Sequence, residues 1–491
     1  MKLIKLSLFT MTALLAIACG DAGKDGANGT NGADGPAGEP GKSADGNTND
    51  PSISIVNPSR GILDREIEVQ IGGSGTQFEE GAKPDFGEGI EVVEVITSSR
   101  SLINAKLKIA ANAATGPRKV TIGSLAVEGA FTVAPAIDVK GGTVEQGGIV
   151  ELAIDNNDTR AFDAQAFKLE AAGLMDLGSQ ATGPQAAAGF LLAPPLAKAG
   201  KTQIAVQNLG ADGKPKLSFL SSTDAMEIKP RTPLSFTLDT PSEETFASPL
   251  ETKLWKLTTP GTQAAIVDYR VQVAADGTAV PVAFLFGTNG DADAQLGRAA
   301  PPSNPFTGQY NPPPYDLHVA VPVLSGGLPN DHYVVVADLG AGSGKATVTA
   351  SRTNATAVME SGTAHGPDAP QAVGAVTATN AQIATGELAS EAEADVYKFT
   401  VDAADKIQVT ASAAADLEII ITKDPNVFED APNTPPQDRK VLGYMYPGDK
   451  FAAQRSLATA VGGTDVYLVV LSDIQGAVKT GKYTLGVRKL P

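Results

Sequence analysis

Cysteine, histidine and tryptophan are scarce in this chain of 491 residues, which contains one, three and one of them, respectively. A single cysteine excludes an intrachain disulfide, so the folded domains must be stabilised by their hydrophobic cores. It also excludes a metal site made of several thiolates. Three histidines without an H-E-x-x-H sequence exclude the common zinc-hydrolase motif.

Motifs for ester hydrolysis and nucleotide binding are missing as well. No G-x-S-x-G sequence occurs, and the stretch GTNGDADAQLG lacks the G-K-[ST] ending of a phosphate loop. Carboxylates are numerous, so counting them does not exclude a glycosidase with a pair of acids. Such sites usually stack aromatic rings on sugars, whereas aromatics make up 5% of this chain and Trp255 lies in a predicted core strand. We therefore expect a protein that is not an enzyme.

Long hydrophobic runs are also lacking, and the one near the start is short. The mostly apolar run Leu6–Ala18 follows Lys2 and Lys5. A helix of its length reaches roughly 20 Å, which is less than the roughly 30 Å of a bilayer core. A basic start, a short apolar core and small residues at its end predict a secretory signal over residues 1–18.

The only cysteine, Cys19, directly follows Ala16, Ile17 and Ala18. This stretch resembles the lipobox of bacterial lipoproteins, with Leu15 one place further out than the usual leucine. The resemblance implies cleavage before Cys19, a diacylglycerol on its sulfur and an acyl chain on its amine, so that a lipidated N-terminus holds the protein on a membrane. Gly20 in place of an aspartate implies the outer membrane, with the protein facing the periplasm or the cell surface. The alternative is an ordinary signal peptide with an incidental cysteine.

Glycine occupies every third position from Gly20 to Gly41. This G-x-y register resembles the collagen-like tracts of bacterial surface proteins and implies a trimeric stalk. Pro36 and Pro40 are the only prolines of the tract, however, so little polyproline geometry is preformed. Residues 19–51 are therefore interpreted as a lipidated cysteine plus a disordered, flexible linker on a monomer, with the trimer as the alternative.

The formal charge of −17 becomes −19 when Lys2 and Lys5 leave with the signal. No basic stripe remains, so we expect no nucleic-acid partner. The chain has 52 glycines and 33 prolines, and turn residues recur between short runs rich in Val, Ile and Thr. This pattern predicts an all-β fold, a string of immunoglobulin-like and jelly-roll-like β-sandwiches behind the N-terminal tether.

The first predicted sandwich covers residues 52–135. Ile67, Val69 and Ile71 alternate with polar residues, which indicates a strand with one buried face. The stretches NPSRG, VQIGGSGTQF, DFGEGI, AATGPRKVTIG and FTV resemble the IPT/TIG immunoglobulin-like domain. This family serves as spacer, adhesion module or dimerisation module, and none of its core motif residues is catalytic.

The second sandwich, residues 136–233, resembles no family that we recognise. Its segment Asp155–Asp158 offers side-chain oxygens that Ca²⁺ could use, but it lacks the interior glycine and distal glutamate of an EF-hand loop. A solvated hairpin turn is the favoured interpretation of this segment.

Residues 381–491 carry Asp395, Tyr397 and Phe399 in a D-x-Y-x-F pattern, then Asp416-Leu417, and end in a G-x-Y-x-L-x-V strand. They resemble the bacterial pre-peptidase C-terminal (PPC) domain. An internal repeat pairs Trp255 with Tyr397 and Tyr333 with Tyr467, at offsets of 142 and 134 residues. Residues 234–360 are therefore predicted to be a divergent PPC-like copy, joined to the last domain by a linker over 361–380.

Both copies contain a long proline-bearing insert with aromatic residues, and loops on a rigid scaffold often carry recognition. The candidate binding residues are Phe306, Tyr310, Tyr315, Tyr444 and Tyr446. The alternative is that these aromatics pin the loops to their own sheets. Asn289, Asp291 and Asp293 have a ligand-like spacing, and some secreted PPC domains bind Ca²⁺, but no clear closing carboxylate follows. We therefore predict no metal ligands and no cofactor, with Ca²⁺ left open.

These observations favour a non-catalytic envelope lipoprotein that displays β-sandwiches for adhesion or for binding an unknown protein or glycan. Two alternatives remain open. One is a structural spacer of the envelope without a ligand of its own. The other is an accessory component of a secreted hydrolase system, because TIG and PPC modules commonly flank such enzymes.

Overall fold

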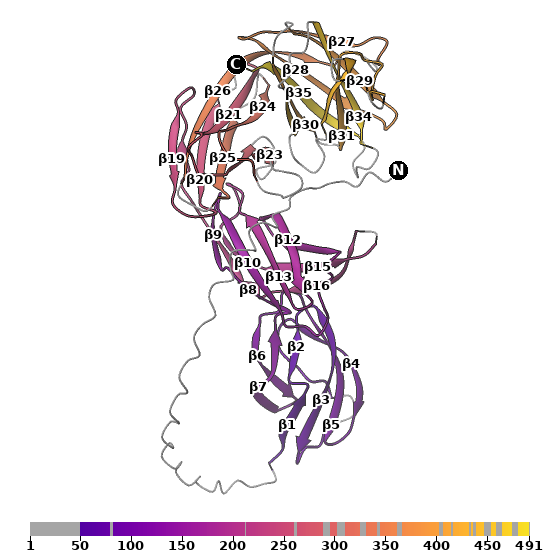
Figure 1. Cartoon of the computed structure of the whole chain (residues 1–491). Coiled ribbons are helices and arrows are strands. Elements are labelled where there is room, and N and C mark those ends of the chain that lie inside the picture. Colours follow the sequence, from indigo (N-terminus) through magenta and orange to yellow (C-terminus); the bar gives the residue numbers. More distant parts are fainter. Residues whose placement is uncertain are drawn as a thin grey trace. The chain divides into compact units, whose positions relative to one another are not determined.

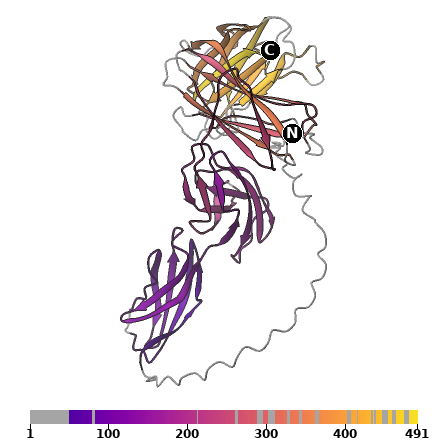
Figure 2. The same cartoon turned by 90° about the vertical axis from the view of Figure 1, so that its left-hand side faces the viewer.

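A computed structural model describes residues 50–78, 82–211, 213–259, 263–287, 295–301, 310–324, 330–340, 344–360, 366–401, 406–413, 416–431, 434–435, 438–445, 453–457, 464–473 and 480–490. These residues contain no α-helix, and Figure 1 and Figure 2 show them as β-sheets joined by loops. Accordingly, the described part of the chain has no helix that could span a bilayer. The all-β prediction is confirmed.

The described residues fall into two compact units. The first comprises residues up to Thr143 together with Glu151–Leu191 and Gly200–Ile228. The second comprises Val144–Val150, Leu192–Ala199 and the chain from Lys229 onward.

The first sandwich of the first unit packs a four-stranded sheet against a three-stranded one. The larger sheet has the order β1-β3-β5-β4, with β1 (Ser52–Asn57), β3 (Arg65–Ser74), β5 (Leu102–Ile109) and β4 (Ile90–Ser98). The smaller has the order β2-β7-β6, with β2 (Arg60–Ile62), β7 (Leu125–Ala134) and β6 (Gly116–Ile122). The predicted alternation holds, since Val69 and Ile71 are buried while Glu68 and Gln70 between them are exposed.

The second sandwich adds a sheet of order β12-β13-β10-β8 and a sheet of order β11-β15-β16. Strand β14 pairs with β17, and the boundary between the two units falls in β9. The strands are β8 (Ile137–Lys140), β9 (Thr143–Glu145), β10 (Ile149–Asn156), β11 (Phe167–Ala171), β12 (Met175–Gly183), β13 (Ala186–Leu192), β14 (Gly200–Thr202), β15 (Ile204–Leu209), β16 (Pro215–Leu220) and β17 (Met226–Lys229).

The second unit contains two further sandwiches, named here the N-repeat and the C-repeat. The N-repeat consists of β18 (Leu234–Ser235), β19 (Ser242–Phe246), β20 (Thr252–Thr259), β21 (Ala265–Val273), β22 (Pro281–Gly287), β23 (Gln295–Ala299), β24 (Tyr315–Val323), β25 (Asn330–Asp338) and β26 (Gly344–Met359). The C-repeat consists of β27 (Gln371–Val376), β28 (Ala381–Leu388), β29 (Ala394–Val401), β30 (Ile407–Ala413), β31 (Leu417–Thr422), β32 (Val441–Met445), β33 (Ala453–Leu457), β34 (Thr464–Ser472) and β35 (Gly481–Lys489).

The two repeats have the same topology strand for strand. Their five-stranded sheets have the orders β18-β20-β25-β22-β23 and β27-β29-β34-β31-β32, and in each the first pair is parallel. The four strands β19, β26, β21 and β24 pair as β28, β35, β30 and β33 do. Every strand thus corresponds to the one nine places later, which confirms the internal repeat.

Side-chain contacts in the two repeats correspond as well. Tyr333 lies opposite Lys256, one residue after Trp255, and Tyr467 lies opposite Lys398, one residue after Tyr397. The same lysines form ion pairs with Asp331 at 2.7 Å and Asp465 at 2.6 Å. The residues that the sequence repeat predicts to be equivalent therefore occupy equivalent positions in the two sheets.

Strand β26 joins the repeats into one eight-stranded sheet. Its residues 347–354 pair with β21 of the N-repeat, whereas 355–359 pair in parallel with β28 of the C-repeat. The expected linker over 361–380 is wrong from Gln371 onward, because β27 pairs with β29 there. Only two hydrophobic residues of β27, Val373 and Val376, are buried, so its local pattern resembles a loop.

A buried charge pair also connects the repeats. Asp268 of β21 accepts from His318 Nδ1 of β24 at 2.8 Å and lies 2.7 Å from Arg488 Nη2 of β35. The side chains of Asp268 and Arg488 are 3% and 5% exposed, and Arg488 Nε donates to Gln408 Oε1 at 2.5 Å. Gly486 lets β35 lie close to Ile266 of β21, because a Cβ at position 486 would be 3.0 Å from Ile266 Cδ1.

The N-repeat core surrounds the only tryptophan. Trp255 is fully buried and stacks on Phe236 with ring centroids 5.6 Å apart. Nearby, Tyr269 Oη and His332 Nδ1 share a hydrogen bond of 2.7 Å, and both side chains are buried. Burial lowers the pKa of His332 to about 4, because the charged imidazolium would lose its hydration.

We predict that the N-repeat loses stability in mild acid. The pKa of His332 is about 4 in the folded state and 6.5 as its ordinary value, so only the unfolded chain binds the proton between these pH values. This contribution to the free energy of unfolding is intact above pH 6.5 and falls by about 3 kcal/mol as the pH drops to 4.

Urea unfolding followed by Trp255 fluorescence at several pH values measures this loss in the N-repeat itself, since Trp255 is the only tryptophan. The variant His332→Gln, which cannot titrate, should lose less stability over the same range. An identical pH profile for both proteins would contradict the assignment to His332.

Candidate functional site

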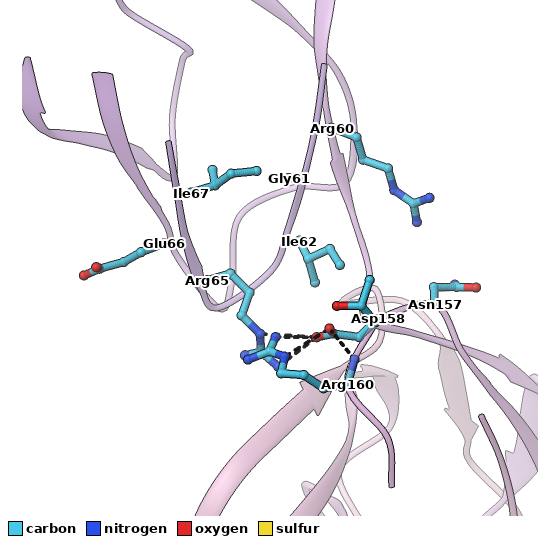
Figure 3. A pocket seen from close by; sticks show the side chains of 10 residues that line it. Arg60, Gly61, Ile62, Arg65, Glu66, Ile67, Asn157, Asp158 and Arg160 are labelled. Carbon is cyan, nitrogen blue, oxygen red and sulfur yellow. Dashed lines mark hydrogen bonds and ion pairs between the residues drawn. The ribbon is translucent and has the colours of Figure 1, made fainter. Parts of the chain in front are cut away.

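A pocket of about 400 Å³ lies in the first unit, where the first and second sandwiches meet. Strand β2, the start of β3 and the loop after β10 form its wall (Figure 3). Its lining residues are Arg60, Gly61, Ile62, Arg65, Glu66, Ile67, Asn157, Asp158, Thr159 and Arg160. Three arginines in one pocket are unusual in a chain with a net charge of −17, so this pocket is the candidate functional site.

The local backbone explains how the β2 and β3 residues reach the pocket. Gly61 lets β2 lie against the core, because a Cβ there would come 2.7 Å from the Phe131 ring. Asp64 adopts a left-handed φ of 56° in the turn after β2, a conformation that aspartate tolerates better than most residues. The turn brings Arg65 back toward the second sandwich.

Asp158 is the centre of the polar contacts. Its side chain is 3% exposed and accepts hydrogen bonds from two guanidinium groups. Arg65 approaches with Nε at 3.4 Å and Nη2 at 3.3 Å, and Arg160 with Nε at 3.0 Å and a short contact through Nη2. Figure 3 shows the two arginines converging on this carboxylate. A buried charge needs such partners, since desolvation would otherwise cost several kcal/mol.

Arg65 also holds the two sandwiches of the unit together. Its Nη2 donates to the Ser218 carbonyl, and its guanidinium lies 5.9 Å from the centre of the Phe219 ring. Leu220 of β16 belongs to the same hydrophobic cluster as the first sandwich core. The junction is therefore packed and hydrogen-bonded, and the pocket wall is ordered before any ligand arrives.

The remaining wall residues offer unused donors. Within the described part of the chain, no hydrogen bond or ion pair is formed by the side chains of Arg60, Asn157 and Thr159. Glu66 instead pairs with Lys106 at 2.6 Å, and a hydrogen bond from Lys106 lowers the pKa of Glu66.

The sequence predicted neither this pocket nor the role of Asp158. The segment Asp155–Asp158 is not a solvated turn, because Asn156 and Asp158 are 8% and 6% exposed. It is not a calcium loop either, since Asp155 pairs with Lys140 at 2.6 Å while Asp158 is neutralised by the arginines. The pair Arg65–Asp158 spans 93 residues, and no local pattern indicates such a contact.

The candidate aromatic residues have different environments. Tyr315 is 5% exposed and packs in the N-repeat core, so the prediction that it contacts a partner is wrong. Its hydroxyl donates a hydrogen bond to the Asn311 carbonyl and so holds the preceding loop against the sheet. Tyr310 is half-buried, and burial raises its pKa. Tyr444 is half-buried and donates to the Phe428 carbonyl at 2.9 Å. Cys19, Phe306 and Tyr446 lie outside the described residues, as do Asn289, Asp291 and Asp293.

One group of acids in the described chain could hold a metal ion. Oxygens of Glu360, Glu393 and Asp395 all lie within 4.8 Å of one another. Asp395 is fully buried and accepts from Tyr483 Oη at 2.5 Å, while Glu360 accepts from the Glu387 amide at 2.9 Å. Three carboxylates this close repel one another, and a set of ligands made of oxygens alone fits Ca²⁺. The sequence resemblance named Asp395 as a motif residue but did not group it with Glu360.

Comparison with known proteins gives one family match, over the first sandwich. The family described as quinohemoprotein amine dehydrogenase, alpha subunit domain III, matches residues 50–133. This span is the first sandwich, and the match is not to the IPT/TIG domain expected from the sequence. No curated protein matches the chain significantly.

Three solved structures are similar to parts of the chain. The pre-peptidase C-terminal domain of a Bacillus anthracis collagenase is 12% identical, with 25% of this chain and 97% of that one covered and a TM-score of 0.19. Domains 5–6 of the S-layer protein SbsC are 12% identical, covering 37% and 100%, with a TM-score of 0.14. A structure of carbohydrate-binding modules from the β-sandwich superfamily is 9% identical, covering 62% and 98%, with a TM-score of 0.15.

These TM-scores are too low to carry an argument about function. The sheets of the described residues themselves show a string of β-sandwich modules.

We predict that removing Asp158 loosens the junction more than removing Arg160. Asp158→Ala leaves Arg65, whose side chain is 13% exposed, without its carboxylate, and we expect a loss of about 3 kcal/mol. Arg160→Ala removes a side chain that is 42% exposed and should cost about 1 kcal/mol or less. Hydrogen–deuterium exchange of peptides covering 60–67 and 157–160 measures both losses. Equal protection in the two variants would contradict the central role of Asp158.

We predict that Ca²⁺ stabilises the C-repeat through the three acids. A dissociation constant on the order of 10⁻⁴–10⁻³ M, as in extracellular modules, gives about 1.4 kcal/mol at ten times that concentration. Calorimetric titration and thermal unfolding should show binding in the wild type and its loss in Glu360→Gln. The matched control Glu391→Gln changes an exposed acid outside the group and should bind normally. A wild type that ignores Ca²⁺ would refute the site.

Proposed function

We propose that this protein is a non-catalytic lipoprotein of the bacterial outer membrane whose β-sandwiches bind a partner protein or glycan. The observation that carries the proposal is the position of the only cysteine, Cys19, directly after a short apolar run and before a glycine-rich segment. Residues 19–51 then act as a tether, and the described domains follow from residue 50 onward.

The architecture supports a binding role. Each sandwich presents loops on a scaffold whose core is formed from both sheets, an arrangement that favours recognition by loops and junctions. The pocket between the first two sandwiches is ordered by Arg65 and Asp158, and its free donors suit a ligand better than a structural role alone.

The histidines of the described residues have structural partners, which supports the absence of catalysis. His332 is buried against Tyr269, and His318 bonds to Asp268 at the contact between the repeats. His365 lies outside the described residues.

A structural spacer is the second candidate. The observation in its favour is that the repeats share one sheet and a buried ion pair, which makes the second unit stiff. A spacer would need this stiffness but not the unpaired Arg60 in the pocket. For that reason we rank binding first.

We predict that Cys19→Ala releases the protein from the membrane fraction, because the acyl chains on Cys19 supply the free energy of attachment. Labelling with radioactive palmitate and density separation of the two membranes test the lipid and its location. Ser43→Ala, a change in the same segment, should leave labelling and outer-membrane recovery unchanged. A Cys19→Ala protein that is processed and still membrane-bound would overturn the anchor.

A further inference from the structure

We propose that the pocket between the first two sandwiches binds the carboxylate of an acidic sugar. This inference rests on the proposed function and gives its glycan a chemical class. The wall of the pocket has an excess of positive charge. Asp158 faces both Arg65 and Arg160, so one carboxylate balances only one of two guanidinium groups.

Other acids near the pocket do not cancel the excess. Asp64 lies 3.9 Å from Arg65 Nη1, but its side chain is 52% exposed, so solvent screens the contact. Glu66 is already paired with Lys106. Arg60 adds a second positive charge that no described residue neutralises. Three arginines against Asp158, with Glu66 already paired, therefore leave an excess of two positive charges among the lining residues, and counting the exposed Asp64 beside Arg65 leaves one.

The geometry suits an oxyanion attached to a hydroxylated ring. Figure 3 shows Arg60 and Asn157 extending to the same side of the pocket. The exposed guanidinium of Arg60 can donate two parallel hydrogen bonds to a carboxylate, which is the geometry that arginine prefers. Asn157 and Thr159, which have no other side-chain partner in the described chain, can bond to ring hydroxyls.

The apolar part of the wall narrows the ligand class. Ile62 and Ile67 are half-buried and line the pocket, but none of its lining residues is aromatic. A neutral sugar would find no ring to stack on, so its binding energy would be small. A sugar acid gains charge-assisted hydrogen bonds, which contribute more than neutral ones. The volume of about 400 Å³ is large enough for one or two sugar rings.

The wall is also ordered before binding. Arg65 is held by Asp158 and by the Ser218 carbonyl, and Asn156 closes the loop by accepting from the Asp158 amide at 2.8 Å and donating to the Arg160 carbonyl at 2.7 Å. A ligand therefore has to order only Arg60 and the exposed donors, which reduces the entropic cost of binding.

Calorimetry and saturation-transfer NMR on the full-length protein in detergent test the proposal, with glucuronate and galacturonate as probes and glucose and galactose as their neutral counterparts. We expect the acids to bind at least tenfold more tightly than the neutral sugars. Arg60→Ala should weaken acid binding about tenfold, because it removes a bond to a charged group. Arg60→Lys keeps the positive charge but lacks the planar guanidinium, so its affinity for the sugar acids should lie between those of the wild type and Arg60→Ala.

Arg100→Ala is the matched control, since Arg100 is an exposed arginine of the same sandwich that does not line the pocket. It should bind like the wild type. Equal binding of acidic and neutral sugars, or an Arg60→Ala variant that binds normally, would overturn the proposal. Inorganic phosphate or sulfate binding as tightly as the sugar acids would also contradict it, because the ring would then contribute nothing.

The sugar-binding experiment and the membrane-anchor experiment can succeed or fail independently. Absence of sugar-acid binding leaves the Cys19 prediction standing, and a Cys19→Ala protein that stays membrane-bound leaves the pocket result standing.

Discussion

The second unit depends on one long strand that belongs to both repeats. The first part of β26 pairs with β21, and its last five residues pair in parallel with β28. Because this pairing fixes the register between repeats, Asp268 and Arg488 from distant strands can meet at 2.7 Å inside the protein. A buried ion pair adds little net stability but strongly disfavours any arrangement that separates its partners. Because the chain has a single cysteine, backbone pairing and buried charge connect the repeats without a disulfide.

The contact between the two repeats and the contact between the first two sandwiches are each centred on one buried aspartate that two side chains share. In the second unit the carboxylate of Asp268 is shared by one arginine, Arg488, and by the imidazole of His318. In the first unit Asp158 is shared by two arginines, one of which must stay uncompensated. An uncompensated charge destabilises a buried contact, whereas an uncompensated charge that reaches solvent can attract a ligand of opposite charge. This difference separates a junction that only joins from one that can also bind.

Much of the fold could be predicted because its determinants are local. Alternation along β3 and the motif around Tyr397 indicated strands with one buried face, and the offset between Trp255 and Tyr397 gave the repeat. The junctions could not be predicted, because Arg65 and Asp158 lie 93 residues apart and any exposed arginine has the same local pattern. Strand β27 was missed for a related reason: it is held by parallel pairing with β29, and few of its side chains are buried. Tyr315 stands beside prolines in the sequence, which is typical of a loop, but it is the first residue of β24 and is buried in the core.

The shared strand also limits how this protein can change by recombination. Independently folded domains can be lost, gained or exchanged one at a time, because each domain buries its own core and leaves no sheet edge to be covered by its neighbour. The C-repeat cannot be removed in this way. A chain ending after Met359 would leave five residues of β26 as an open sheet edge and would leave Asp268 buried without Arg488. Ala264, Ile266 and Ala320 would also lose their cover from Ala381 and Ile383. The two repeats are therefore expected to be inherited as a single module.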